Sequence, residues 1–299
     1  MIVNRRRVMG GGGVKPYLRF TALEDGTFKH NTAALEYSVD EGNTWVALAA
    51  NTDSPTVTAG NSILWRGKRS VGSENHYFVA TGRFDASGNP LSLQYKDNFV
   101  DAAASSRYGF YKLFQNCTTL VNAKDIIIPT NITGGQFCMR MFEGCSSLIS
   151  IPQLPNTSVA ADCYSTMFSG CSSLTMVQLP EGMVSIDSSM FQNCTNLNVS
   201  IPSTVTTIGG NAFYSCKSIT ELTLPSGVTS IGANPFVYMS NLTTVTCLAT
   251  TPPSSGGNNP FNGDSNLSHI YVPAASVDDY KAAKGWSTYA SKIQAIPTT

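Results

Sequence analysis

The sequence has little charge and no long apolar segment. Only 13% of its 299 residues are charged, with 19 basic and 19 acidic side chains, whereas charged residues make up roughly 25% of an average soluble protein. Because coating nucleic acid or a membrane surface depends on clustered Lys and Arg, this balance argues against both roles. The apolar runs are far shorter than the roughly 20 residues that a transmembrane helix needs. We therefore expect neither nucleic-acid binding nor membrane insertion.

Patterns for catalysis and for metal binding are also lacking. The sequence contains no G-x-S-x-G elbow, no P-loop and no H-E-x-x-H motif. None of its eight cysteines belongs to a C-x-x-C pair, and the three histidines, His30, His76 and His269, lie far apart in the chain. Zinc-ligand spacing is therefore absent. We expect a protein that is not an enzyme, with no catalytic residues, no metal site and no cofactor.

Charged side chains are unevenly distributed along the chain. Residues 1–100 contain 20 of them, whereas residues 110–250 contain ten. This change in composition predicts a domain boundary near residue 100. The polar surface is instead rich in hydroxyl groups, because the chain contains 34 Ser and 30 Thr. Such a surface suits the binding of sugars or packing in an assembly.

Short alternating patterns predict several β-strands before this boundary. Apolar side chains two residues apart, between Gly, Asn, Asp and Pro, are typical of strands and occur at 17–23, 35–38, 44–48, 62–66, 77–81 and 91–95. Gly60 and Gly88 lie between them and can supply the left-handed backbone of turns. Strands of this length and spacing are typical of a small β-sandwich.

One turn in this region carries a recognisable motif. Ser38–Trp45 has the pattern S-x-D-x-G-x-T-W, which resembles the Asp-box hairpin of sialidases and other β-propellers. Asp40 can accept turn amide hydrogens, Gly42 permits a positive φ, and Trp45 can fold over the hairpin. A propeller would need several copies of this motif, and the sequence contains one. We therefore expect a structural turn rather than a catalytic site.

A motif of Phe, Cys and Leu recurs from residue 110 onward. Its full form is F-x-x-C-x-x-L, with Ile in place of Leu in the fifth copy, and two degenerate copies follow; the repeated phenylalanines are Phe114, Phe142, Phe168, Phe191, Phe213, Phe236 and Phe261. A period of 22 to 28 residues with one short strand in each repeat predicts a leucine-rich-repeat solenoid, because a single coil cannot bury its apolar edge alone. The repeated Phe and Leu should point inward.

Most of the cysteines follow the same period. Five occupy one position of the repeat, where a small apolar side chain fits a stacked core: Cys117, Cys145, Cys171, Cys194 and Cys216. Cys163 falls where other copies have isoleucine, so it should also fill the core. We expect buried free thiols. Neighbouring coils lie about 5 Å apart, within the Cα separation of a disulfide, so occasional bridges stay an alternative.

Several repeat segments resemble the BspA-like, or Treponema-type, leucine-rich-repeat proteins of Bacteroidetes. Ile208–Phe213 and Ile231–Phe236 read IGGNAF and IGANPF, and Ile186–Phe191 is a third copy of the same segment. These are similar to the family's I-G-x-x-A-F pattern, and the resemblance covers about residues 90–299. It implies a solenoid fold and a binding role, because the family includes surface adhesins.

The predicted fold class is α+β with a repeat solenoid. We expect four regions: a flexible basic and Gly-rich arm at 1–16, a β-sandwich-like domain at 17–99, a leucine-rich-repeat solenoid at 100–273 and a short helical cap at 274–299. In the cap, Ser276 should cap a helix with two aspartates in its first turn, and Gly285 should end it. Trp286 and Tyr289 should cover the end of the core.

Outward positions of the repeat strands are the predicted ligand-binding surface. Because side chains alternate along a strand, an inward Val177 leaves its two neighbours exposed, and the matching positions of later coils extend them into a stripe. Solenoids usually bind partners on such a face. The stripe consists of Met176, Gln178, Asn198, Ser200, Glu221, Thr223, Thr244, Thr246, His269 and Tyr271. An ordinary solvated sheet face is the alternative for each single residue.

These features predict a recognition or attachment protein that binds a host cell-surface glycan or protein. The leader contains Arg5, Arg6 and Arg7 and then four glycines, without the apolar segment of a signal peptide. It looks like the start of structural proteins of Bacteroides phages and prophages. We therefore expect a phage or prophage tail component, located in the virion, whose three arginines contact other virion proteins. The alternatives are an exported bacterial cell-surface adhesin and a purely structural virion component without ligand binding.

Overall fold

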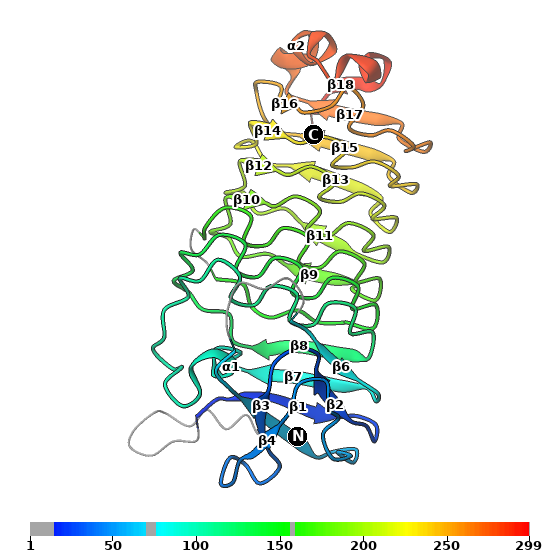
Figure 1. The fold of residues 1–299 in the computed structure, drawn as a ribbon. Coiled ribbons are helices and arrows are strands. Elements are labelled where there is room, and N and C mark those ends of the chain that lie inside the picture. Colours follow the sequence, from blue (N-terminus) through cyan, green and yellow to red (C-terminus); the bar gives the residue numbers. More distant parts are fainter. Residues whose placement is uncertain (1–14, 70–75, 156–158, 299) are drawn as a thin grey trace.

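The computed structural model describes residues 15–69, 76–155 and 159–298. A β-rich N-terminal region, a stack of repeat coils and a small helical cap follow one another along an elongated molecule (Figure 1). Strands dominate, and the helices are few and short, as expected for the leucine-rich-repeat solenoid that the sequence predicts. Among the described residues, no helix is long and apolar enough to cross a membrane.

The N-terminal region contains short strands and one short helix. The strands are β1 (Leu18–Ala22), β2 (Phe28–His30), β3 (Leu35–Ser38), β4 (Val46–Leu48), β5 (Ser62–Arg66), β6 (Phe78–Ala80) and β7 (Phe84–Gly88). Five of the six predicted strands are confirmed, and β2 and β7 were not predicted. The strand predicted at 91–95 is wrong, because this segment forms the helix α1 (Ser92–Tyr95). Asn89 Oδ1 accepts the Leu91 N–H at 3.0 Å, which turns the chain at Pro90 and starts a helical turn.

The main sheet of this region continues into the solenoid. Its strand order is β4-β3-β5-β1-β7-β8, and β8 (Leu120–Ile126) belongs to the first coil. The pair β7–β8 is parallel, whereas the other pairs of this sheet are antiparallel. The first repeat ring, Phe114, contacts Phe20 and Phe78 with ring centroids 5.7 and 6.1 Å away. The region therefore shares its core with the solenoid, and a separate β-sandwich stays a prediction.

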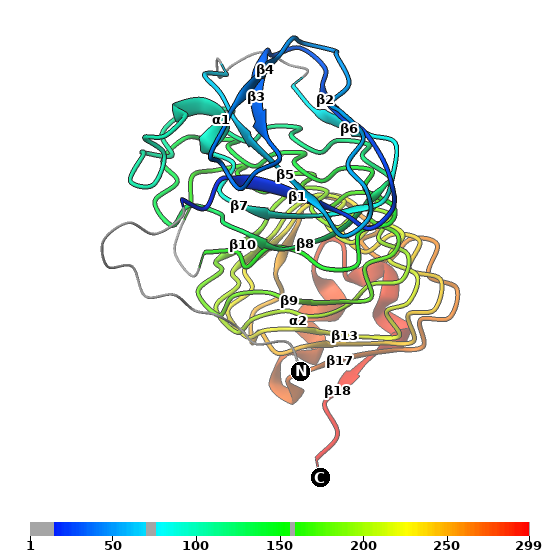
Figure 2. The ribbon, with the colours of Figure 1, turned by 90° about the horizontal axis from the view of Figure 1, so that it is seen from below.

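Parallel strands from successive coils form the sheets of the solenoid. One face carries β9 (Met176–Gln178), β11 (Asn198–Ser200), β13 (Glu221–Leu224), β15 (Thr244–Cys247), β17 (His269–Val272) and finally β18 (Ile293–Ala295). A second face carries β10 (Ser185–Ile186), β12 (Thr207–Ile208), β14 (Ser230–Ile231) and β16 (Ser254–Ser255). The pairings in both faces are parallel and in register, so each coil repeats the path of the one before (Figures 1 and 2).

The repeated phenylalanines form one continuous stack inside the coils. Successive rings from Phe114 to Phe261 have centroids 5.4–6.1 Å apart and planes within 13° of parallel. All seven side chains are at most 2% exposed, which confirms the predicted inward orientation. Because burial of a Phe stabilises a fold by roughly 1.5–3 kcal/mol, this stack is a main source of solenoid stability.

On the side of the coils that carries the Phe motif, the backbone hydrogen bonds between coils all run one way. The amides of Phe191 and of the residues two before and two after it donate to carbonyls of the next coil at 2.8–2.9 Å. Ser189 and Asn193, the two flanking donors, have φ values of 55° and 61°, a conformation that Asn and Gly tolerate best. The other coils repeat this pattern. The carbonyls in these backbone bonds therefore face the N-terminal end of the array, and the amides in them face the C-terminal end.

The N-terminal region supplies donors to the carbonyls of the first coil. The Phe78 N–H donates to the Leu113 carbonyl at 3.0 Å. The Gly109 carbonyl accepts from Gln94 Nε2 at 2.6 Å and from the buried guanidinium of Arg69. Because a buried carbonyl without a donor would destabilise the fold, these contacts close the first coil.

The C-terminal cap covers the other end of the array. It consists of the 3-10 helices η1 (Ala274–Ser276) and η2 (Ser287–Lys292), the helix α2 (Val277–Ala282) and β18. Trp286 and Tyr289 are buried against Phe261, with ring centroids 5.9 and 5.4 Å from it. Their predicted role as a cover over the core is confirmed. The Tyr289 hydroxyl also accepts the Phe261 N–H at 3.1 Å, so the cap supplies an acceptor.

Ser276 does not cap the helix that it precedes. Helix α2 begins at Val277 with two aspartates in its first turn, as expected, but it receives no side-chain cap hydrogen bond. The Ser276 hydroxyl instead donates to the Thr250 carbonyl at 2.7 Å. The predicted capping role is therefore wrong, because this hydroxyl ties the cap to the preceding coil. Gly285 follows the helix with φ +84°, as a chain reversal there requires.

Candidate binding surface

The predicted stripe lies on the face formed by β9, β11, β13, β15 and β17 (Figure 1). Its side chains form two rows, because matching residues of successive strands are paired. The first row holds Met176, Asn198, Glu221, Thr244 and His269, and the second holds Gln178, Ser200, Thr223, Thr246 and Tyr271. The side chains on β9, β11 and β13 are exposed, and those on β15 and β17 are half-buried. The structure thus brings all ten to one surface.

The rows are interrupted in the middle of the face. In the described part of the chain, β9 pairs with β11 alone, and β13 begins a second ladder. The segment from Leu197 to Pro202 is one residue shorter than the segment from Leu174 to Pro180, and the interruption follows this shorter coil. The stripe therefore consists of two parts, which we call the β9–β11 patch and the β13–β17 patch.

The β9–β11 patch is hollowed. Residues 176–179, 181 and 198–203 line a hollow of about 660 Å³, and a second hollow of about 470 Å³ extends from β9 to residues 149–154 and Lys124. Two apolar side chains reach solvent here, since Met176 is 77% exposed and Ile149 is 52% exposed. Pro152 in the second hollow has no N–H and cannot extend a strand ladder. This part of the surface offers apolar, amide and hydroxyl groups to a ligand.

The β13–β17 patch combines hydroxyl groups with an aromatic pair. The rings of His269 and Tyr271 are 8° from parallel, with centroids 5.6 Å apart. Thr246 is the strand partner of Tyr271, and the Ser268 hydroxyl lies 2.8 Å from His269 Nδ1. Glu221 is the only carboxylate among the six stripe residues of this patch. The patch can form hydrogen bonds and stack on a flat apolar surface.

A family comparison identifies the repeat. The profile described as the BspA type leucine-rich repeat region matches in six copies, over residues 111–199 and 197–281. The chain belongs to the BspA-type leucine-rich-repeat family. These matched residues, which make up more than half of the chain, include every residue of the predicted stripe.

Solved structures also resemble this BspA-type chain. A leucine-rich-repeat protein from Bacteroides ovatus is 24% identical, with 52% of this chain and 39% of that one covered and a TM-score of 0.40. A leucine-rich cell surface protein from Faecalibacterium prausnitzii is 19% identical, with 81% and 71% covered and a TM-score of 0.42. The T. pallidum leucine-rich-repeat protein is 19% identical, with 76% and 95% covered and a TM-score of 0.36. No curated protein matches. This chain spans well under half of the Bacteroides ovatus protein.

The cysteines of this BspA-type array are core residues. All eight are buried and free, which confirms the prediction. Four thiols each donate to the carbonyl of the repeated Phe in the preceding coil, with S···O distances of 3.0–3.1 Å: Cys145, Cys171, Cys194 and Cys216. Burial raises the pKa of Cys117 to about 11 and that of Cys194 to about 12. The four donor thiols therefore link neighbouring coils, and burial disfavours the thiolate form that a nucleophile needs.

Two further predictions concern metals and the arm. Among the described residues of the BspA-type chain, no three His, Cys, Asp or Glu side chains are grouped so that they could hold a metal ion. Arg5, Arg6 and Arg7, the predicted contacts to other virion proteins, lie outside the described residues.

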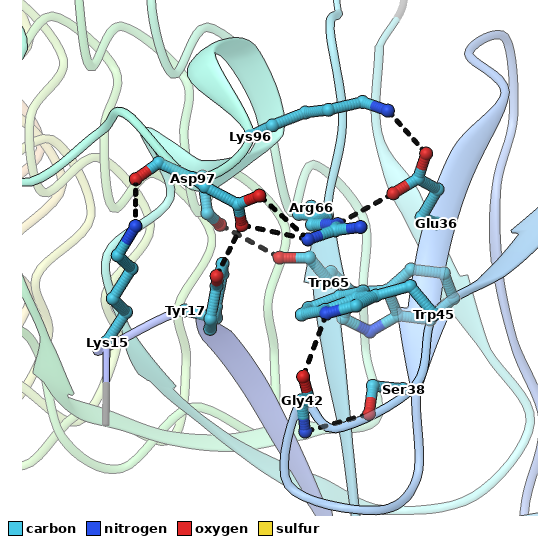
Figure 3. A network of polar contacts seen from close by, with 11 residues as sticks. Lys15, Tyr17, Glu36, Ser38, Gly42, Trp45, Trp65, Arg66, Lys96 and Asp97 are labelled. Atoms are coloured by element: carbon cyan, nitrogen blue, oxygen red, sulfur yellow. Dashed lines mark hydrogen bonds and ion pairs between the residues drawn. The ribbon is translucent and has the colours of Figure 1, made fainter. Parts of the chain in front are cut away.

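The Asp-box segment forms the structural turn that its sequence predicts (Figure 3). Asp40 Oδ1 accepts the Thr44 N–H at 2.9 Å, and Oδ2 accepts the Thr44 hydroxyl at 2.6 Å. Hydrogen bonds from Ser38 and Thr44 lower the pKa of Asp40 to about 2. Gly42 has φ +87°, and Trp45 Nε1 donates to the Gly42 carbonyl at 3.1 Å. The indole therefore folds over the hairpin.

Charged residues that the motif did not reveal hold this turn against the main sheet. The Arg66 guanidinium lies 4.1 Å from the Trp45 ring centroid and bonds to Glu36 at 2.6 Å and to Asp97 at 2.9 Å. Lys96 also bonds to Glu36, as Figure 3 shows. These residues are spread over 62 positions of the chain, so no local pattern could group them. Every charged side chain labelled in Figure 3 has a hydrogen-bond or ion-pair partner, which indicates a structural network.

Proposed function

We propose that this protein is a non-enzymatic recognition or attachment protein that binds a cell-surface glycan or protein through the β9–β17 face of its solenoid. The observation that carries the proposal is the strand register within β9–β11 and within β13–β17, which aligns outward side chains in rows on one face. Membership of the BspA-type family supports a binding role, since repeat solenoids present extended surfaces to partners.

The two patches suit different parts of one ligand. The hollow at β9 and β11 has exposed Met176 beside the amides of Gln178 and Asn198. The β13–β17 patch adds hydroxyl groups and the parallel rings of His269 and Tyr271. Apolar groups flanked by orienting polar groups are typical of ligand sites. A glycan or a polar protein surface can satisfy both sets of groups.

We further propose that the protein works as part of a phage or prophage tail. The similarity of its Arg- and Gly-rich leader to structural proteins of Bacteroides phages supports this location. Display of several copies on one particle would raise the avidity of weak contacts by about 10²–10⁴. The second candidate is a bacterial cell-surface adhesin, which membership of the BspA-type family supports.

Binding is tested with two triple variants that remove the same residue types from different faces. The test variant changes Gln178, Thr223 and Tyr271 to Ala, on the proposed binding face. The control variant changes Gln192, Thr207 and Tyr238 to Ala, which lie in the Phe-motif turns and on the second sheet. Binding to intact Bacteroides cells and to a glycan array should fall at least tenfold in the test variant only. Equal binding by all three proteins would refute the face assignment.

The location is tested separately from binding. Particles released by prophage induction and washed cell envelopes are probed with an antibody against the full chain. Signal on tail structures supports the virion proposal. Signal confined to the cell envelope would favour the adhesin, and the binding experiment would stand in either case.

A further inference from the structure

One position of the repeat changes its chemistry toward the C-terminal end of the array. The position three residues after the repeated Phe holds Cys in the first five coils, Met239 in the sixth and Asp264 in the seventh. Asp264 is 6% exposed, although a carboxylate is rarely buried without a partner charge. This substitution places an ionisable group where every full repeat has a buried thiol.

Asp264 contacts the preceding coil, as the thiols at this position of the repeat do. Its Oδ1 accepts the Met239 N–H at 2.7 Å. Its Oδ2 is buried and has no hydrogen-bond partner among the described residues. In the cysteine coils the side chain donates to the carbonyl of the preceding repeated Phe, for example from Cys216 to Phe191 at 3.1 Å. The corresponding carbonyl here belongs to Phe236.

We propose that Asp264 is a protonation-dependent clasp between the last two coils. In its acid form, Oδ1 accepts the Met239 amide hydrogen and Oδ2–H donates to the Phe236 carbonyl. Loss of the proton removes the second bond and leaves a buried negative charge facing a carbonyl oxygen. The C-terminal end of the solenoid is therefore stronger in acid than in mild alkali.

The surroundings of Asp264 favour the acid form. Burial raises the pKa of Asp264 to about 8, and the Met239 amide and the charge of Lys292 oppose this rise without cancelling it. The ammonium group of Lys292, on η2, donates a hydrogen bond to the Leu267 carbonyl at 2.5 Å. Tyr289 of the same element also interacts electrostatically with Asp264. On the neighbouring coil, the phenol ring of Tyr238 packs beside Gly263.

The direction of the pH effect follows from linkage. Between the ordinary pKa of Asp, about 4, and the raised one, the folded protein holds a proton that the unfolded chain has lost. Stability from this group is therefore complete at low pH and falls as pH rises toward about 8. The equilibrium constant for unfolding should rise by up to tenfold for each pH unit in this window. Above about pH 8, Asp264 contributes no further change of stability with pH.

The experiment compares the full chain with Asp264→Asn and Asp264→Cys between pH 5 and pH 9. Asn keeps an acceptor and a permanent donor, and Cys restores the residue of the other coils. Both variants should lose the part of the pH dependence of denaturant unfolding that the wild type shows between pH 5 and pH 8. Asp279→Asn, at an exposed position of α2, is the control and should keep the wild-type slope.

Carbon-13 NMR of the aspartate carboxyl groups gives a second readout. One carboxyl resonance should titrate near pH 8 in the wild type and be missing in Asp264→Asn. An Asp264 resonance that titrates near pH 4, or an unfolding slope that is the same in Asp264→Asn as in the wild type, would overturn the proposal. The resonance decides the question if a variant does not fold.

Discussion

The two ends of the array are closed by opposite chemistry. At the first coil, the N-terminal region brings donors to free carbonyls, from Phe78 and from the side chains of Gln94 and Arg69. At the last coil, the cap brings an acceptor, the Tyr289 hydroxyl, to the Phe261 amide. The difference follows from the one-way hydrogen bonds beside the Phe stack. A solenoid built this way needs two different caps, and neither can replace the other.

The coils between the ends need no capping groups, because the backbone donors and acceptors of each coil pair with those of its neighbours. Substitution of Phe191 tests the middle of the array, because its ring centroid lies 5.7 Å from the stacked rings on both sides. Phe191→Ala removes a fully buried ring from the middle of the stack. We expect a loss of roughly 3–5 kcal/mol in the free energy of unfolding, measured by denaturant titration followed by circular dichroism. Phe191→Leu keeps more of the volume and should lose less; an unchanged melt for the Ala variant would contradict the inward stack.

The C-terminal closure is tested by removal of a single oxygen. Tyr289→Phe keeps the ring on Phe261 but leaves the Phe261 N–H without its acceptor. A buried donor without a partner destabilises a fold by about 1–3 kcal/mol. Tyr271→Phe is the matched control, because Tyr271 is half-buried on the sheet face. Thermal melts should show a clear decrease for the first variant and little change for the second; equal decreases would mean that the hydroxyl is not a cap.

The same contrast explains how far the sequence could predict the structure. The Phe stack, the buried thiols and the outward rows of the β9–β17 face each repeat with the period of the coils, so one alignment is enough to predict them. Contacts that occur once have no period. Ser276 has the type and place of a helix cap, yet its hydroxyl reaches the Thr250 carbonyl 26 residues away.

The interruption between β11 and β13 has a sequence signal, but that signal is ambiguous. The coil at Leu197 is one residue shorter than its predecessor, but a sequence does not show whether neighbouring coils absorb such a change. The hollow beside β9 depends on Ile149, Gln153 and Lys124 of earlier coils. Those coils have longer, proline-interrupted segments, so their outward residues could not be aligned with the stripe. Strand β2 has only three residues, and β7 (FDASG) has few apolar side chains, so no local pattern marked either strand.

The smallest expected effect concerns the charged network in the N-terminal region. The direction in which its stability changes with pH distinguishes the two ends of the molecule. A hydrogen bond from Tyr17 lowers the pKa of Asp97, and one from Lys96 lowers that of Glu36, with Arg66 adding to both. Carboxylates with lowered pKa values stabilise the fold above pH 4 or so and lose this contribution as pH falls through the lowered values. The N-terminal network should therefore weaken in acid, whereas the Asp264 clasp weakens in alkali.

Arg66→Met removes the shared cation of this network while it keeps a side chain over Trp45. Because the paired groups are partly exposed, we expect a loss of about 1 kcal/mol at pH 7, with a smaller difference from wild type at pH 2–3, where the carboxylates have begun to take up protons. Denaturant titrations at both pH values measure this change. Lys29→Met, which breaks an exposed pair at 3.9 Å, should have almost no effect at either pH. A loss for Arg66→Met that is equal at both pH values would mean that packing on Trp45, and not charge, holds the Asp-box turn in place.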